Sequence, residues 1–344
     1  MKNNFIKLCD ELSYKDYFKY YCFLNCYYNI LKYYGINQPL HYLDCHIDFK
    51  YEEGDFQTIF TCADKFSSLN PLLSKALHYY SDDTIDENER VKLENDLISK
   101  GIPIIMTVDI YYLPYTPFYK KKHGFHSLIY CGLIDESDEV FIYDWYDPWY
   151  YKGLLSRSVL EDARKSLNED DGILGNVPIK HLSYYIDNDI QPKNPKIYLH
   201  QTFSLLIDKF FSDNPNQGYN ALIKLFETIQ KLNTEEYEVQ KLKLETLYNS
   251  LYFVKYREYL LLNYFNAFFL EDSEIRFIYL LKELADKWNV LCNQILKVIY
   301  KKHTNEDIEN IKNKFFEICL NEKEFYYEIF CFYSRLIFFD CVEK

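Results

Sequence analysis

The stretch "HSLIYCGLIDESDEVFIYD" (residues 126–144) decides how we expect the first half of this chain to fold. Its two ends, 126–133 and 139–144, are rich in β-branched and aromatic residues, and a short acidic segment joins them. Two such runs around a short polar connection are typical of an antiparallel β-hairpin. The start of the first strand then lies opposite the end of the second. The sequence therefore predicts that His126 lies beside Asp144 or a residue close to it.

Two segments before the hairpin extend this prediction. The stretch "GIPIIMTVDIYYLPY" (101–115) has the same composition and predicts a further strand. The stretch "YYCFLNCYYNILKYYG" (20–35) predicts a helix over 20–34 that ends at Gly35, because glycine readily adopts the left-handed conformation that follows a helix. Helix and strand together predict an α+β fold for this half of the chain.

The pattern changes after "DNDIQPKNPK" (187–196), which we interpret as a linker. Beyond it the apolar residues recur at helical spacing, most clearly over 275–300, where Asp272 or Ser273 could cap the helix. The sequence therefore predicts two domains, a catalytic domain at 1–190 and an all-helical bundle at 197–344.

Charge and composition exclude several classes of protein. The 344 residues carry a formal net charge of −13, which argues against binding to nucleic acid. The N-terminus has no apolar signal region, and no stretch approaches the roughly 20 apolar residues that span a membrane. Ten cysteines without a regular framework fit free thiols. We therefore expect a cytoplasmic protein without nucleic-acid or membrane partners.

Cys22 and Cys26 are the candidates for nucleophilic chemistry. Cys22 lies at the start of the predicted helix, where the helix dipole lowers a thiol pKa, whereas Cys26 lies one turn deeper, towards the core. A cysteine nucleophile also needs a histidine, which in turn needs a group to orient it. His126 and Asp144 fit these two roles. His123 and Asp147 remain as the competing imidazole and carboxylate.

Two further patterns have more than one interpretation. The basic run "KKKH" (120–123) is either a small positive patch beside the site or a solvated loop. The segment "HYLDCH" (41–46) could join Cys22 and Cys26 in a zinc site, but its spacing lacks the usual CxxC pairs. We therefore predict no metal.

Several motifs in sequence order carry a resemblance to a known family. The stretch "CFLNCYYNILKYYG" (22–35) resembles the nucleophile helix of papain-like cysteine enzymes of the double-glycine leader peptidase type. The block from "LISKGIPIIMTVDIYYLPY" through "YDWYDP" (97–148), continued by "SVLEDAR" (158–164), is similar to the N-terminal domain of butirosin biosynthesis protein H. The resemblance covers roughly residues 15–165. The chain also resembles, in architecture, the amide-forming cysteine-protease homologue of closthioamide biosynthesis.

This resemblance implies a papain-like fold and an N-acyltransferase, or amide synthase, of antibiotic and nonribosomal-peptide-type biosynthesis. Such an enzyme takes an acyl or peptidyl chain from the phosphopantetheine thioester of a carrier protein and passes it to an amine or diamine. It binds no cofactor of its own. The expected catalytic residues are Cys22, His126 and Asp144. Leader peptidases of this type usually have a glutamine about six residues before the nucleophile. Asp16 stands here instead and cannot donate to an oxyanion when ionised.

Aromatic residues around these motifs could exclude water and position the acceptor amine. The substrate-binding candidates are Asp109, Tyr111, Tyr112, Tyr115 and Trp145, with Tyr146 beside them. Asp109 matches a family position, where it could face an amine or orient its loop. Two alternatives to the transferase stay open, a cysteine peptidase or amide hydrolase and a catalytically silent binding module.

Overall fold

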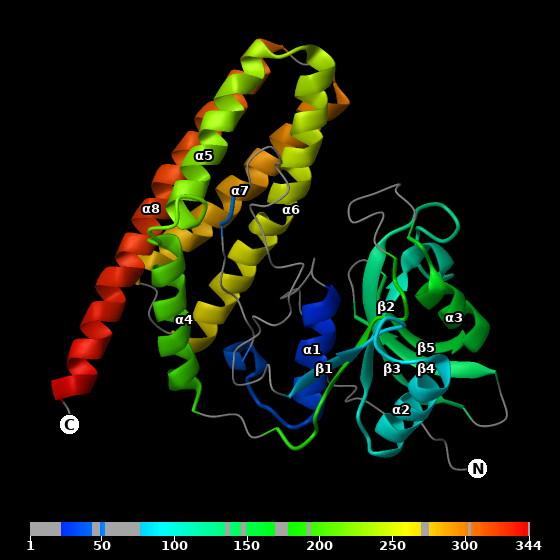
Figure 1. Ribbon diagram of the computed structural model, residues 1–344. Coiled ribbons are helices and arrows are strands. Elements are labelled where there is room, and N and C mark those ends of the chain that lie inside the picture. The colour runs from blue at the N-terminus through cyan, green and yellow to red at the C-terminus, as the bar shows by residue number, and fades with distance from the viewer. Residues whose placement is uncertain are drawn as a thin grey trace. The chain divides into compact units, whose positions relative to one another are not determined.

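The chain forms two compact units, residues 1–43 with 69–192 and residues 44–68 with 193–344 (Figure 1). The computed structural model describes residues 22–42, 49–51, 76–134, 138–145, 149–168, 178–190, 194–269, 275–301 and 304–342. The first unit combines helices with an antiparallel sheet, which confirms the predicted α+β class.

The first unit is built on a six-stranded sheet with the order β1-β6-β2-β3-β4-β5, and every described strand pairing in it is antiparallel. The strands are β1 (Leu77–Tyr80), β2 (Ile104–Asp109), β3 (Phe125–Leu133), β4 (Glu139–Asp144), β5 (Tyr151–Ser156) and β6 (Ser183–Ile186). The helices are α1 (Cys22–Tyr33), α2 (Glu87–Ser99) and α3 (Arg157–Lys165), with short 3-10 helices η2 (Pro39–Tyr42) and η5 (Ile110–Tyr112).

The predicted hairpin is present as β3 and β4. Ile129 pairs with Tyr143 and Tyr130 with Ile142, and a bulge shifts the register between Tyr130 and Gly132. An irregularity of this kind adds a residue to one strand and increases its local twist. The hairpin brings the first residues of β3 beside the last residues of β4.

One face of the sheet carries the main core of this unit. Apolar side chains two residues apart on β2, β3 and β4 pack together because alternate residues of a strand point to the same face. Leu97 of α2 and Leu160 of α3 complete this cluster. Phe23 of α1 instead packs edge-to-face on Tyr184, 5.0 Å away between ring centroids.

Helix α1 ends as the sequence predicts. Gly35 has φ +82°, its N–H donates to the carbonyl of Lys32 over 2.9 Å, and the N–H of Ile36 donates to the carbonyl of Leu31 over 3.0 Å. These two bonds form a Schellman motif, which satisfies carbonyls that the helix end leaves free.

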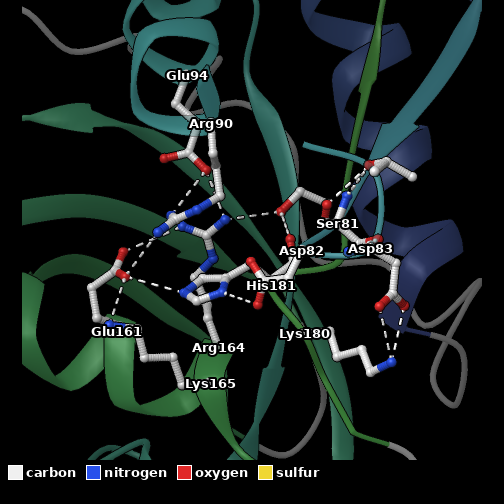
Figure 2. Close-up of polar contacts among 12 residues, drawn as sticks. Ser81, Asp82, Asp83, Arg90, Glu94, Glu161, Arg164, Lys165, Lys180 and His181 are labelled. Atoms are coloured by element: carbon white, nitrogen blue, oxygen red, sulfur yellow. Dashed lines mark hydrogen bonds and ion pairs between the residues drawn. The ribbon is translucent and has the colours of Figure 1, made fainter. Parts of the chain in front are cut away.

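A buried ionic network joins α2 to α3 (Figure 2). The guanidinium of Arg164 donates to Glu94 over 2.7 Å and to Glu161 over 3.4 Å, and Arg90 donates to Glu161 over 3.4 Å. Both arginines are almost fully buried, so each needs these carboxylates to balance its charge. Despite the opposing effect of burial, hydrogen bonding from His181 and the arginine charges lower the pKa of Glu161 to about 2.

His181 extends the network to the start of β6. Its Nδ1 lies 2.8 Å from Asp82 and its Nε2 lies 3.2 Å from Glu161. Figure 2 draws both contacts as dashed lines. Both His181 and Lys180 have φ near +50°, which side chains other than glycine rarely adopt. The ion pairs therefore hold a strained turn between α3 and β6.

The second unit is helical in its described regular elements. They are α4 (Pro195–Phe210), α5 (Gly218–Lys231), η6 (Leu232–Thr234), α6 (Tyr237–Phe268), α7 (Arg276–Tyr300) and α8 (Asn305–Val342). Helix α7 confirms the helix predicted over 275–300, with its predicted apolar stripe buried from Phe277 to Val298. Ile275 is its N-cap residue, and the predicted caps Asp272 and Ser273 lie outside the described residues.

A segment that precedes the sheet in sequence belongs to this helical unit. Phe49 packs on Phe210 and Trp288, and its carbonyl accepts from the N–H of Gly218 over 2.7 Å. Gly218 has φ +59°, and a Cβ there would lie 2.2 Å from the carbonyl oxygen of Phe210, so only glycine fits this contact. Domain bounds of 1–190 and 197–344 stay a prediction.

Two carboxyl groups lie in the core of the helical unit. Glu258 of α6 and Glu322 of α8 are both fully buried, and the indole N–H of Trp288 donates to Glu322 over 2.6 Å. Burial and the neighbouring carboxyl group raise the pKa of Glu258 well above its ordinary value, and burial raises that of Glu322 to about 7. A proton held by Glu258 avoids the repulsion that two ionised carboxylates would have in this core.

Candidate active site

Three side chains from separate elements meet in the sheet unit. Cys22 is the first residue of α1, His126 is the second residue of β3, and Asp144 is the last residue of β4. Nε2 of His126 lies 2.9 Å from each carboxylate oxygen of Asp144, and both side chains are buried. Since Nε2 is engaged by Asp144, the hydrogen bond between His126 and the Cys22 thiol uses Nδ1.

The charges of this group favour a thiolate beside an imidazolium. Burial alone would raise the pKa of Cys22, but the charge of His126 and hydrogen bonds from His126 and Ser127 outweigh it and lower that pKa. Burial likewise favours neutral His126, but the charges of Asp144 and Cys22 outweigh it and raise the pKa of His126 to about 10. Both shifts favour an anionic Cys22 beside a cationic His126, which is the reactive state of a cysteine nucleophile.

Cys26 has the opposite environment. It is fully buried one turn further along α1, and its thiol donates to the backbone carbonyl of Ser127 over 3.6 Å. Burial and the negative charges of Cys22 and Asp144 raise its pKa well above the ordinary value. The structure thus places the two thiols in different environments, one that lowers the pKa of Cys22 and one that raises the pKa of Cys26.

Asp144 receives two hydrogen bonds besides that of His126. The hydroxyl of Tyr115 donates to Oδ2 over 3.0 Å, and the indole N–H of Trp149 donates to the same oxygen over 3.2 Å. The ring of Trp149 also meets that of His126 edge-on, with centroids 5.7 Å apart. The sequence analysis did not single out Trp149. The sequence feature that could have indicated it is its position shortly after Asp144, the last residue of β4.

Asp109 is fully buried at the end of β2, where four donors surround it. The backbone N–H groups of Tyr111 and Gly124 donate to Oδ1 over 3.0 and 3.1 Å, while Ser166 and Nδ1 of His123 (2.6 Å) contact Oδ2. These contacts favour a role in orienting the loop over contact with a substrate. They also fix the backbone two residues before His126.

The other predicted aromatic residues lie in two places. Tyr111 and Tyr112 are partly exposed on η5, where Tyr111 stacks on His123 with 4.2 Å between ring centroids. Trp145 is buried and stacks on Tyr143 at 4.6 Å. The structure therefore brings Tyr115 to the Cys22–His126–Asp144 group, and it gives Trp145 a packing partner within the sheet unit.

The competing candidates have separate positions. His123 pairs with Asp109, so it is not the partner of Asp144. Lys120, Lys121 and Lys122 are exposed. Asp16, Tyr146, Asp147 and residues 43–46 of the alternative zinc segment lie outside the described residues.

Within the described parts of the chain, no group of three or more His, Cys, Asp or Glu side chains could hold a metal ion. Among the described helices, none is long and apolar enough to cross a bilayer.

Fold and site together define an α+β protein with the side chains that thiolate chemistry requires. Residues 66–145 match the family described as butirosin biosynthesis protein H, N-terminal, which confirms the resemblance to that family over this region. The matched region contains β2, β3 and β4, and hence His126 and Asp144, whereas Cys22 lies before it. The resemblance to the closthioamide homologue stays a prediction. No curated protein matches the chain.

Proposed function

We propose that this protein is a cysteine-dependent N-acyltransferase of antibiotic biosynthesis, with a papain-like catalytic domain. The observation that carries the proposal is the position of His126, which hydrogen bonds to the Cys22 thiol on one side and to the Asp144 carboxylate on the other. The family match over 66–145 supports a biosynthetic enzyme. In this proposal the acyl or peptidyl chain arrives on the phosphopantetheine thioester of a cytoplasmic carrier protein.

The first half-reaction loads the enzyme. The Cys22 thiolate attacks the thioester carbonyl, a bond forms between Sγ and the carbonyl carbon, and the bond to the pantetheine sulfur breaks. The leaving pantetheine sulfur takes the proton that His126 carries, which leaves an acyl-enzyme and a neutral imidazole. Asp144 holds the imidazole in the orientation that this transfer needs.

The second half-reaction forms the amide. An amine or diamine attacks the acyl-enzyme, its surplus proton passes to His126, and Cys22 leaves as a thiolate. Amide formation instead of hydrolysis requires that the amine reaches the acyl group before water does. Tyr111 and Tyr112, which are partly exposed after β2, are the residues that we propose contact the incoming amine or the acyl chain.

Intact-protein mass spectrometry with an acyl-loaded carrier protein tests the proposal. Wild type and Cys26→Ala should gain the acyl mass, Cys22→Ala should not, and an added diamine should discharge the acyl-enzyme to an amide. Release of the free acid in the presence of diamine would replace the transferase with a hydrolase. A wild type that never gains mass, from carrier thioesters or from peptides, would leave a silent binding module.

A further inference from the structure

The site contains a polar contact that the proposed chemistry does not use. Tyr115 stands on the loop after η5, and its hydroxyl donates to Oδ2 of Asp144 over 3.0 Å. The carboxylate is buried, and a hydrogen bond to a charged acceptor is stronger than one between neutral groups. Such a bond restricts rotation of the carboxylate about its last side-chain torsion.

The ring of Tyr115 is itself fixed by packing. It stacks on Tyr151 of β5 with centroids 4.1 Å apart and an angle of 6° between the ring planes. Asp144 pairs with the same Tyr151 in the β4–β5 ladder. The hydroxyl therefore reaches Asp144 from a ring that the neighbouring strand holds in place. The phenol keeps its proton, because burial and the Asp144 charge raise the pKa of Tyr115 well above its ordinary value.

We propose that Tyr115 is a positioning residue for the catalytic group: its hydroxyl fixes the Asp144 carboxylate so that both oxygens face Nε2 of His126. This inference rests on the proposed function of Cys22, His126 and Asp144. Without the hydroxyl, the longer bond from Trp149 (3.2 Å) still reaches Oδ2, but the carboxylate turns more freely and fixes the imidazole ring less firmly. Fewer molecules then hold the imidazolium against Cys22, and thiolate formation requires a higher pH.

The test is the pH dependence of Cys22 alkylation by iodoacetamide in the full chain, followed peptide by peptide in a mass spectrometer. The acid limb of this profile is the pH range over which the alkylation rate rises as the thiol ionises. In wild type it should lie at lower pH than for an ordinary thiol. Tyr115→Phe keeps the ring and its stacking, and should move the acid limb to higher pH and slow alkylation at neutral pH about tenfold. Tyr34→Phe is the matched control, because its hydroxyl donates to the carbonyl of Ile186 over 2.8 Å, away from Asp144.

A double-mutant cycle separates positioning from general stability. If Tyr115 acts through Asp144, Tyr115→Phe should cause no further shift in an Asp144→Asn background. An unchanged acid limb in Tyr115→Phe, or an equal further shift in the Asp144→Asn background, overturns the inference while the proposed function stands. A wild-type limb at the position of an ordinary thiol overturns both.

A second variant covers a Tyr115→Phe protein that fails to fold. Tyr115→His places a shorter donor on the same loop. If that variant folds, its acid limb should lie at higher pH than that of wild type, because the shorter imidazole does not extend as far towards Oδ2 as the phenol does. A folded Tyr115→His protein with the wild-type limb would show that the hydroxyl contact has no positioning role.

Discussion

The imidazole of His126 lies with Nε2 2.9 Å from both oxygens of Asp144, although 18 residues separate the two in the chain. The β3–β4 hairpin makes this contact, because antiparallel pairing returns the end of the second strand to the start of the first. Cys22 reaches the same imidazole from α1, about a hundred residues earlier.

Cys22 should react with iodoacetamide at lower pH than an ordinary thiol, because the charge of His126 lowers its pKa despite burial. His126→Ala removes that charge, so the acid limb of the alkylation profile should move to higher pH. Cys26→Ala serves as the control and should leave the profile in place, since burial raises the pKa of Cys26 and keeps it protonated. Rapid alkylation of Cys26 in the native protein would contradict this assignment.

Asp144→Asn should lower the rate of acyl-enzyme formation at least about 100-fold, the lower range for removing the acid–base function of a positioned group. The asparagine amide keeps the size of the side chain but removes the charge that raises the pKa of His126 to about 10. The alkaline limb of the pH–rate profile should therefore move to lower pH. Single-turnover mass spectrometry with an acyl-loaded carrier protein measures both effects. A wild-type profile in this variant would exclude Asp144 as the third member.

Asp109→Asn should destabilise the sheet unit by about 2 kcal/mol, because an amide nitrogen cannot accept from His123 and the charge-assisted bonds are lost. Hydrogen exchange of β2 and β3 peptides under native conditions measures the change. Asp83→Asn is the control, since Asp83 is an exposed side chain paired with Lys180. If Asp109 contacts substrate instead of orienting the loop, the variant should keep wild-type exchange and lose only transferase activity.

Acid should weaken the sheet unit through Glu161. Its folded pKa of about 2 lies below the ordinary value of about 4.3, so its contribution is present above the ordinary value and is lost as the pH falls towards 2. Glu161→Gln should lower stability at neutral pH and flatten the dependence in that window. Unfolding by urea between pH 5 and 2.5 checks this, with the exposed Glu139→Gln as the control. Equal acid sensitivity in both variants would contradict the role of the network.

The helical unit should show the opposite dependence. The folded pKa values of Glu258 and Glu322 lie above the ordinary value, so their contribution is present below about pH 4.3 and is lost as the pH rises through about 7. Glu258→Gln removes one of the two titrating carboxyl groups and should therefore remove part of this loss. Hydrogen exchange of peptides from α6, α7 and α8 at pH 5.5 and 8 measures it. A steeper loss in the variant than in wild type would contradict this role of the two buried carboxyl groups.

Local sequence determined the elements that carry the site. The alternating apolar residues of 126–133 and 139–144 specified the hairpin, Gly35 specified the end of α1, and the apolar stripe of 275–300 specified α7. These features follow from short-range periodicity and from backbone conformations that few residues adopt. His126 and Asp144 became neighbours in the prediction because a hairpin is a local structure.

Only the tertiary structure decided the remaining contacts. That Tyr115 and Trp149 both donate to Asp144, that four donors surround Asp109, and that Glu258 meets Glu322 all depend on packing between elements far apart in the chain. No periodicity records such contacts, because a side chain's partner depends on burial and on which donors face it after folding. The sequence alone thus determined which residues could react, and tertiary packing determined which neighbours set their charge and orientation.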